Sequence, residues 1–296
     1  MAEFSERFFR SGALRIHFRD WGDSAAPPLV LVHGLRDHSH SFDDLARGLV
    51  DRFRVLALDL RGHGDSATTP YYHVGQFVLD LHNLVRALRL EHPVVVGHSM
   101  GGEVVANYCG SFPDAPRAAV IIEGLGPPPP AMTQEVAWAV AGFERIDQAI
   151  AGPPGLADLD AAYRRLRERN PRLPESRARD LALLGTRARE DGKLEWKFDP
   201  MLATMAVTGP FHLEYQMAFW RRIAAPTLIV HGGESGEFWR HRPGAPYLDP
   251  DDLARRIGCF RDAEFASIAG AGHMVHFDRP RELLATLRDF LGRRAS

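Results

Sequence analysis

Runs of consecutive apolar residues, with no polar alternation, are the feature of this sequence that most constrains its fold. A run of this kind suits a strand that is buried on both faces of a parallel sheet. Helix-compatible stretches over residues 42–50 and 77–88 lie between the early runs. Alternating strands and helices predict a doubly wound, mostly parallel α/β sheet. The runs cover residues 29–32, 55–58, 94–96, 119–122 and 227–230.

Weaker signals at both ends extend this sheet. Residues 8–10 and 14–19 flank Ser11-Gly12-Ala13 with near-alternating polarity, which predicts an opening hairpin at the sheet edge. A last strand is expected at residues 264–268, followed by an amphipathic helix over residues 281–291. The sequence therefore predicts an eight-stranded sheet.

The alternation of strands and helices stops after Ile122. Residues 124–130 read Gly-Leu-Gly-Pro-Pro-Pro-Pro, through which neither a strand nor a helix can run, and the next apolar run begins only at Thr227. We therefore expect residues 126–222 to form an inserted helical domain on a core made of residues 1–125 and 223–296. Its predicted helices, separated by prolines and glycines, span residues 133–150, 156–170, 175–191 and 211–223.

A strand-to-helix turn carries the candidate nucleophile, Ser99. The turn reads Gly97-His98-Ser99-Met100-Gly101 and directly follows an apolar run. A serine at such a turn has a strained backbone that lifts its hydroxyl clear of the sheet, and the flanking glycines let strand and helix pass closely. Serine is a weak nucleophile and needs a base, a group that holds the base, and donors for an oxyanion.

Further motifs occur in a fixed order along the chain. His33-Gly34 follows one apolar run, the segment 59–66 (Asp-Leu-Arg-Gly-His-Gly-Asp-Ser) follows the next, and Gly272-His273 lies ahead of Pro280. With the serine turn, these motifs resemble the α/β-hydrolase family over residues 15–125 and 223–292. The resemblance implies that the insertion is a helical cap over the active site.

The resemblance also implies roles for individual residues. His273 matches the family's C-terminal histidine and is the expected base, while His276, the nearest competitor, is expected to be structural. The expected oxyanion donors are the backbone N–H groups of Leu35 and Met100.

The acid departs from the usual family pattern. Most relatives carry an aspartate in the loop after the seventh strand, but Ser235 or Gly236 stands there in this sequence. Glu123 directly follows the sixth strand, which the family layout places beside the serine strand, about 5 Å away. Haloalkane dehalogenases and zearalenone-type lactonases place their acid at this point. Glu123 is therefore the expected acid, with Glu234 and Glu237 as alternatives.

A serine nucleophile predicts hydrolysis of an ester or lactone through an acyl-enzyme. Aromatic residues are frequent in the insertion, which indicates a small, fairly apolar substrate and a pocket formed by Trp138, Trp196 and Trp220. The alternatives on the same fold are a carbon-carbon bond hydrolase, a cofactor-free lyase and a slow-turnover ligand sensor.

Charge and cysteine content restrict the partners. Lys plus Arg number 36 and Asp plus Glu 38, a net charge of -2, which gives no indication of a nucleic-acid or membrane partner. The arginine-rich stretch at residues 163–169 is interpreted as a solvated helix face. Cys109 and Cys259 lie outside any metal-binding spacing, and no phosphate or dinucleotide motif is present. We expect no cofactor, no metal and a cytoplasmic location.

Overall fold

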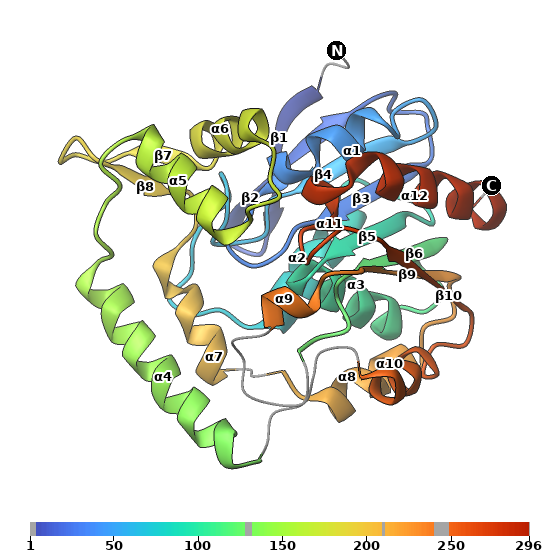
Figure 1. The fold of residues 1–296 in the computed structure, drawn as a ribbon. Coiled ribbons are helices and arrows are strands. Elements are labelled where there is room, and N and C mark those ends of the chain that lie inside the picture. The colour runs from blue at the N-terminus through green and yellow to red at the C-terminus, as the bar shows by residue number, and fades with distance from the viewer. Residues whose placement is uncertain (1–3, 128–131, 209–210, 240–248, 296) are drawn as a thin grey trace.

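A single sheet of eight strands, in the order β1-β2-β4-β3-β5-β6-β9-β10, runs through the centre of the computed structural model (Figure 1). The structure describes residues 4–127, 132–208, 211–239 and 249–295. Strands β1 and β2 form the predicted antiparallel hairpin, β2 pairs antiparallel with β4, and the remaining neighbours are parallel. The strands are β1 Phe4–Ser11, β2 Leu14–Trp21, β3 Pro28–Val32, β4 Arg54–Leu58, β5 Val94–His98, β6 Ala118–Ile122, β9 Thr227–Gly232 and β10 Ala263–Ile268.

Two separate hydrophobic cores lie on the two faces of the sheet, because successive side chains of a strand point to opposite faces. Val30 and Val32 of β3 belong to one core, whereas Leu29 and Leu31 belong to the other. Helices α2 (Val74–Ala87) and α3 (Met100–Ser111) contribute to the first core. Helices α1 (Asp43–Arg47) and α12 (Pro280–Arg294) contribute to the second. Both faces are covered, which confirms the doubly wound sheet.

The segment between β6 and β9 is mainly helical, as predicted. It contains helices α4 (Met132–Ala151), α5 (Leu159–Arg169), α6 (Glu175–Leu184), η2 (Pro200–Thr204), α7 (Met205–Thr208) and α8 (Leu213–Trp220). Helices α4 to α7 lie to the left of the sheet in Figure 1, whereas α8 lies below it and packs on α3. No helix in the described ranges combines the length and the apolar character that crossing a bilayer requires.

The helix predicted over residues 175–191 is wrong beyond Leu184. Gly185 follows that helix, and the chain then forms a two-stranded hairpin of β7 (Thr186–Ala188) and β8 (Leu194–Trp196). Asp191-Gly192 lies in the connecting loop, where Gly192 has a φ of 78° that suits glycine. The turn residues of the hairpin were therefore present in the sequence, but the helix-compatible composition of the preceding residues outweighed them in the prediction.

Short elements complete the edge where the parallel strands end. They are η1 (Ser39–Phe42) after β3, α9 (Gly236–Trp239) after β9 and α11 (Val275–Asp278) after β10, while α10 (Pro250–Ile257) leads into the start of β10. The carboxyl ends of parallel strands meet at one edge of a sheet, and ligand sites in open α/β sheets form there. The predicted site residues Ser99, Glu123 and His273 all follow strand ends at this edge.

Candidate active site

Ser99 occupies a strained turn between β5 and α3. Its φ of 55° and ψ of -121° are unusual for a residue with a side chain. The turn closes tightly because its flanking residues are glycines: a Cβ on Gly97 would lie 2.1 Å from the carbonyl oxygen of Gly101, and one on Gly101 would lie 2.2 Å from that of Val32. The predicted strand, sharp turn and helix are thus present.

His273 lies beside Ser99 with its imidazole Nε2 2.9 Å from the serine Oγ. Its loop is fixed by two hydrogen bonds. The Gly272 N–H donates to Asp278 Oδ2 at 2.8 Å, and His98 Nε2 donates to the carbonyl oxygen of His273 at 2.8 Å. The histidine is 6% exposed. It is therefore held in hydrogen-bond reach of the serine hydroxyl.

Glu123 follows β6 and brings its carboxylate to the other ring nitrogen of the histidine. Its Oε2 lies 3.1 Å from His273 Nδ1. The Glu123 Oε1 accepts hydrogen bonds from the Gly232 N–H, at 2.7 Å, and from the Ser235 hydroxyl. Because a carboxylate only accepts hydrogen bonds, the ring proton resides on Nδ1, and Nε2 is left to accept the proton of Ser99. We refer to Ser99, His273 and Glu123 as the triad.

The environment of Glu123 pulls its pKa in opposite directions. Burial raises the pKa of the carboxyl above its usual value, and His231 and the hydrogen bonds from Ser235 and Gly232 offset only part of this rise. Burial also lowers the pKa of His231, against the attraction of Glu123. The two donors to Oε1 thus favour the carboxylate form that the histidine requires.

The alternative acids do not occupy this position. Glu237 forms an ion pair with Arg172 at 2.7 Å, and Glu234 is exposed. Ser235, at the point where the usual aspartate is expected, is fully buried and donates its hydroxyl to Glu123. The loop after β9 therefore supplies a donor to the carboxylate instead of the carboxylate itself.

The loop after β3 packs directly against the serine turn. A Cβ on Gly34 would lie 3.2 Å from Ser99 Cβ. Buried His33 supports this loop, since its Nδ1 donates to the Gly34 carbonyl at 2.7 Å and its Nε2 accepts the Leu60 N–H at 3.1 Å. Leu35 follows Gly34, and Met100 is the first residue of α3, where backbone N–H groups have no acceptor within the helix.

Two aromatic residues beside the histidine were missed by the sequence analysis. Phe238 of α9 stacks on His273, with ring centroids 4.0 Å apart and an interplanar angle of 11°, and Trp239 meets the same ring edge-on at 5.7 Å. No periodicity marks them, because α9 is a single short turn in an irregular loop. His276 is buried and packs edge-on against His98 at 4.5 Å, behind the triad.

The tryptophans expected in the pocket lie in different surroundings. Trp220 is 1% exposed and stacks on Phe260 at 5.5 Å in the core beside α3, so we withdraw it from the pocket. Trp196 is half-buried and stacks on Phe198 at 6.1 Å. The side chain of Trp138 falls outside the described residues.

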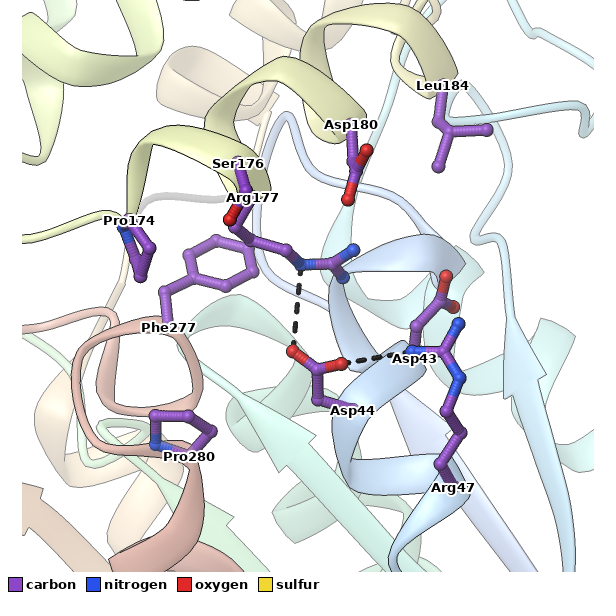
Figure 2. A pocket seen from close by; sticks show the side chains of 10 residues that line it. All are labelled: Asp43, Asp44, Arg47, Pro174, Ser176, Arg177, Asp180, Leu184, Phe277 and Pro280. Carbon is purple, nitrogen blue, oxygen red and sulfur yellow. Dashed lines mark hydrogen bonds and ion pairs between the residues drawn. The ribbon is translucent and has the colours of Figure 1, made fainter. Parts of the chain in front are cut away.

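A surface pocket of about 400 Å³ lies between α1 and α6, and no triad residue lines it (Figure 2). Asp44 sits there between two arginines, 3.0 Å from Arg47 and 4.0 Å from Arg177. Both arginines of this pocket therefore have an acidic partner.

Two groups of side chains in the described ranges could hold a cation. One comprises Asp37, His98 and His276, and the other His17, Asp59 and Asp65; within each group the ligand atoms lie within 4.8 Å of one another. His98 already donates one ring nitrogen to His273, and His17 contacts Asp59 at 2.7 Å. We assign no step of the chemistry to either group.

The sequence matches the profile of the alpha/beta hydrolase family over residues 29–286. The chain belongs to this family. It is 27% identical over 275 residues to the sn-1-specific diacylglycerol lipase ABHD11 of Mus musculus, covering 91% of this chain and 82% of the lipase. It is 25% identical over 278 residues to the esterase YbfF of Escherichia coli, covering 89% of this chain and 92% of the esterase.

Other family members extend the comparison to solved structures. The 2-(acetamidomethylene)succinate hydrolase of Mesorhizobium japonicum is 27% identical over 292 residues, covering 97% of this chain and 95% of that enzyme. A crystal structure of E-2-(acetamidomethylene)succinate hydrolase superposes with a TM-score of 0.80 at 25% identity, covering 98% and 100% of the two chains. Relatives in this family are thus hydrolases, among them esterases and lipases.

Proposed function

We propose that this chain is a serine hydrolase that cleaves a carboxylic ester or lactone of a small, fairly apolar molecule through an acyl-enzyme. One observation carries the proposal. Hydrogen bonds run from Ser99 Oγ to His273 Nε2, at 2.9 Å, and from His273 Nδ1 to Glu123, at 3.1 Å, at a strained serine turn. A nucleophile, a base and a group that orients the base, all within reach of one another, are the requirements of acyl transfer.

In the proposed first half-reaction, Ser99 Oγ attacks the carbonyl carbon while its proton passes to His273 Nε2. The negative charge that develops on the carbonyl oxygen is stabilised by the N–H groups of Leu35 and Met100. Glu123 stabilises the imidazolium across Nδ1. Collapse of the tetrahedral intermediate breaks the ester bond, and His273 returns the proton to the leaving alcohol.

In the second half-reaction, water replaces the alcohol. His273 takes a proton from the water as its oxygen attacks the acyl carbon, and the proton then returns to Ser99 Oγ as the acid is released. The two half-reactions together convert the ester and one water into an alcohol and an acid, and no cofactor is required.

The insertion is proposed to act as the cap over this site. Contacts between the insertion and the site loops support this role. Arg172 pairs with Glu237 of α9 at 2.7 Å, and Asn170 Nδ2 donates to Asp278 Oδ1 at 2.8 Å in the segment that follows the histidine. Asp199 of the insertion also accepts a hydrogen bond from the hydroxyl of Tyr72, a residue of the core, at 2.6 Å.

The test is a panel of p-nitrophenyl esters and macrolactones with the wild-type protein and Ser99→Ala. We expect the wild-type protein to hydrolyse members of this panel. By comparison with other triads, kcat should fall by about 10⁶-fold in Ser99→Ala. A fluorophosphonate probe should label wild type at Ser99 and leave Ser99→Ala unlabelled. Turnover by the pure variant above a few per cent of wild type would refute the assignment. Tight ligand binding with few completed cycles would instead support the ligand sensor.

A further inference from the structure

Three polar side chains from separate segments face one another behind the triad. Asp37 lies in the loop after β3, and His98 is the last residue of β5. His276 lies in α11, the short helix that follows the triad histidine. One carboxylate oxygen or ring nitrogen from each of the three lies within 4.8 Å of the others. We refer to Asp37, His98 and His276 as the rear cluster.

The rear cluster contains buried polar atoms that have no hydrogen-bond partner within the described part of the chain. They are Asp37 Oδ2, His98 Nδ1 and both ring nitrogens of His276. His98 is 1% exposed and His276 is 4% exposed. Burying a polar atom without a partner costs free energy, so buried polar atoms are normally paired with protein, water or an ion. A ligand that lies between the three side chains would pair several of these atoms at once.

The hydrogen bonds of His98 decide which of its ring nitrogens faces the cluster. Its Nε2 donates to the carbonyl oxygen of His273 at 2.8 Å, so the neutral ring carries no proton on Nδ1. A Cβ on Gly34 would lie 3.1 Å from that Nδ1, so its lone pair faces the loop after β3, to which Asp37 belongs. A histidine that ligates a metal usually donates its other ring N–H to a carbonyl or a carboxylate, as His98 does.

The carboxylate of Asp37 is oriented by its own loop. Its Oδ1 accepts the N–H of His38 at 2.9 Å and the hydroxyl of Ser41. Its Oδ2 lies 4.0 Å from His276 Nε2. A carboxylate only accepts hydrogen bonds, so Asp37 Oδ2 and His98 Nδ1 present two lone pairs to the same space, and His276 can add a third. Converging lone pairs beside a negative charge favour a cation.

The second group that could hold a cation differs, because its polar atoms already have partners. The ring nitrogens of His17 contact Asp59, at 2.7 Å, and Glu6. Asp59 Oδ1 accepts the N–H of Ser39 at 2.6 Å, and its Oδ2 accepts the N–H of Asp65 at 3.1 Å. Hydrogen bonds within the protein therefore account for this second group, whereas they leave facing atoms of the rear cluster unpaired.

We propose that the rear cluster binds a divalent transition-metal cation, with Asp37 Oδ2, His98 Nδ1 and His276 Nε2 as the protein ligands. Imidazole nitrogens and carboxylate oxygens suit Zn²⁺ and its neighbours in the first transition row. Bonds of about 2.0–2.2 Å to Zn²⁺ set tetrahedral ligand atoms about 3.4 Å apart, so each side chain needs to move by less than about 1 Å.

Such an ion joins segments that support the triad. His98 directly precedes Ser99 and holds the carbonyl of His273, while Asp37 lies in the loop that carries Leu35. The side chain of Asp37 is 14% exposed, which gives the ion a route from the surface. The sequence analysis expected no metal, because these ligands are far apart along the chain and only the fold brings them together.

Calorimetric titration with ZnCl₂ tests the site on wild-type protein that has been treated with EDTA and dialysed. We expect a single Zn²⁺ per chain, with a Kd of about 10 µM or lower. Zn²⁺ at about ten times this Kd should raise Tm by about 3 °C, because the ion binds the folded state. Absence of both the heat of binding and the Tm shift would overturn the proposal.

Co²⁺ as a second probe reports the ligands directly. Visible absorption is intense for Co²⁺ held in four- or five-coordinate geometry by protein ligands, and weak for octahedral, largely hydrated Co²⁺. We expect intense bands with the wild-type protein, and we expect excess ZnCl₂ to remove them. Weak bands alone would place the ion on exposed side chains and would also overturn the proposal.

Two variants remove different ligands. Asp37→Asn removes the negative charge and keeps the acceptor for Ser41, and His276→Phe removes both unpartnered nitrogens and keeps a ring beside Phe42. Each should weaken Zn²⁺ binding by about 100-fold or more, since losing even a partner of a ligand costs about 10- to 100-fold. Asp37→Asn is the conservative change and keeps the test decisive if His276→Phe does not fold.

Asp65→Asn is the matched control, because it makes the same chemical change in the second group of possible ligands. It should bind Zn²⁺ with the wild-type Kd. Circular dichroism confirms the fold of each variant before titration. Wild-type affinity in folded Asp37→Asn, or an equal loss of affinity in Asp65→Asn, would overturn the assignment of the ligands.

Ser99→Ala separates this proposal from the proposed function, on which it does not rest. The variant should bind Zn²⁺ with the wild-type Kd although it hydrolyses no ester. Loss of Zn²⁺ binding in Ser99→Ala would place the ion at the triad and overturn the rear-cluster site. Wild-type protein that binds Zn²⁺ and hydrolyses none of the esters would retain the metal site and refute the hydrolase assignment. Hydrolysis without Zn²⁺ binding would do the reverse.

Discussion

Replacing Glu123 by glutamine removes one charge from the triad and leaves its shape nearly unchanged. The Gly232 N–H and the Ser235 hydroxyl both donate to Oε1, so the amide oxygen of the glutamine must remain on that side. The amide NH₂ then faces His273 Nδ1, at the position where Oε2 now lies 3.1 Å away. Two donors cannot share that contact. The histidine is driven into the tautomer with its proton on Nε2, which cannot accept the proton of Ser99.

The expected loss for Glu123→Gln is about 10⁴-fold in kcat, as for the corresponding acid-to-amide change in serine proteases. This corresponds to about 5 kcal/mol of transition-state stabilisation. The assay is steady-state hydrolysis of a p-nitrophenyl ester at pH 8, with circular dichroism and thermal melting to confirm the fold.

Glu234→Gln and Glu237→Gln are the matched controls, because they make the same chemical change in the neighbouring loop. Both should retain kcat within about threefold, in line with exposed substitutions. If Glu123→Gln kept a tenth of wild-type activity, or if Glu237→Gln lost as much as Glu123→Gln, the tautomer argument would be refuted.

Two further predictions concern titration. Ser235→Ala removes a hydrogen-bond donor that lowers the pKa of Glu123, so the pKa of Glu123 should rise. The acidic limb of the kcat/KM–pH profile should then move to higher pH. An unshifted limb would show that Ser235 does not influence the titration of Glu123. Burial raises the pKa of Glu103 to about 7, so protonated Glu103 favours the folded state, and that stability is lost as pH rises from the unfolded value of about 4.3 to about 7. Glu103→Gln can still accept the hydrogen bond from Gln216. It should therefore raise the free energy of unfolding by about 1–3 kcal/mol at pH 8 and leave it nearly unchanged at pH 4. Equal changes in the free energy of unfolding at both pH values would contradict the raised pKa of Glu103.

The sheet could be predicted because each of its central strands is dictated locally. A β-branched run such as Val94–Val96 has few alternatives to a buried strand, and the glycines around Ser99 are required because a Cβ there would lie as close as 2.1 Å to a backbone oxygen. The position of Glu123 was predicted from the family layout, and β5 and β6 are hydrogen-bonded neighbours whose ends lie together.

Residues that depend on tertiary contacts could not be predicted in this way. Phe238 stacks on His273 only because the loop after β9 folds back across the histidine. Asn170 and Asp278 are far apart in the sequence, and their hydrogen bond exists only once the end of α5 lies beside the histidine loop. The hairpin after Leu184 was missed for a different reason, because a helix-compatible composition outweighed the local turn at Asp191-Gly192.

The hydrogen bonds that join Asn170 to Asp278, and Asp278 to Gly272, have a consequence for how such an enzyme can diversify. The end of α5 shares an anchor with the histidine loop, so replacing that end by a segment from another protein would disturb the position of His273. Helix α4 packs instead on η2 and α7, within the insertion itself. Exchanging α4 and its contacts therefore leaves this anchor of the histidine loop in place, whereas a chimera that exchanges the end of α5 must bring its own partner for Asp278.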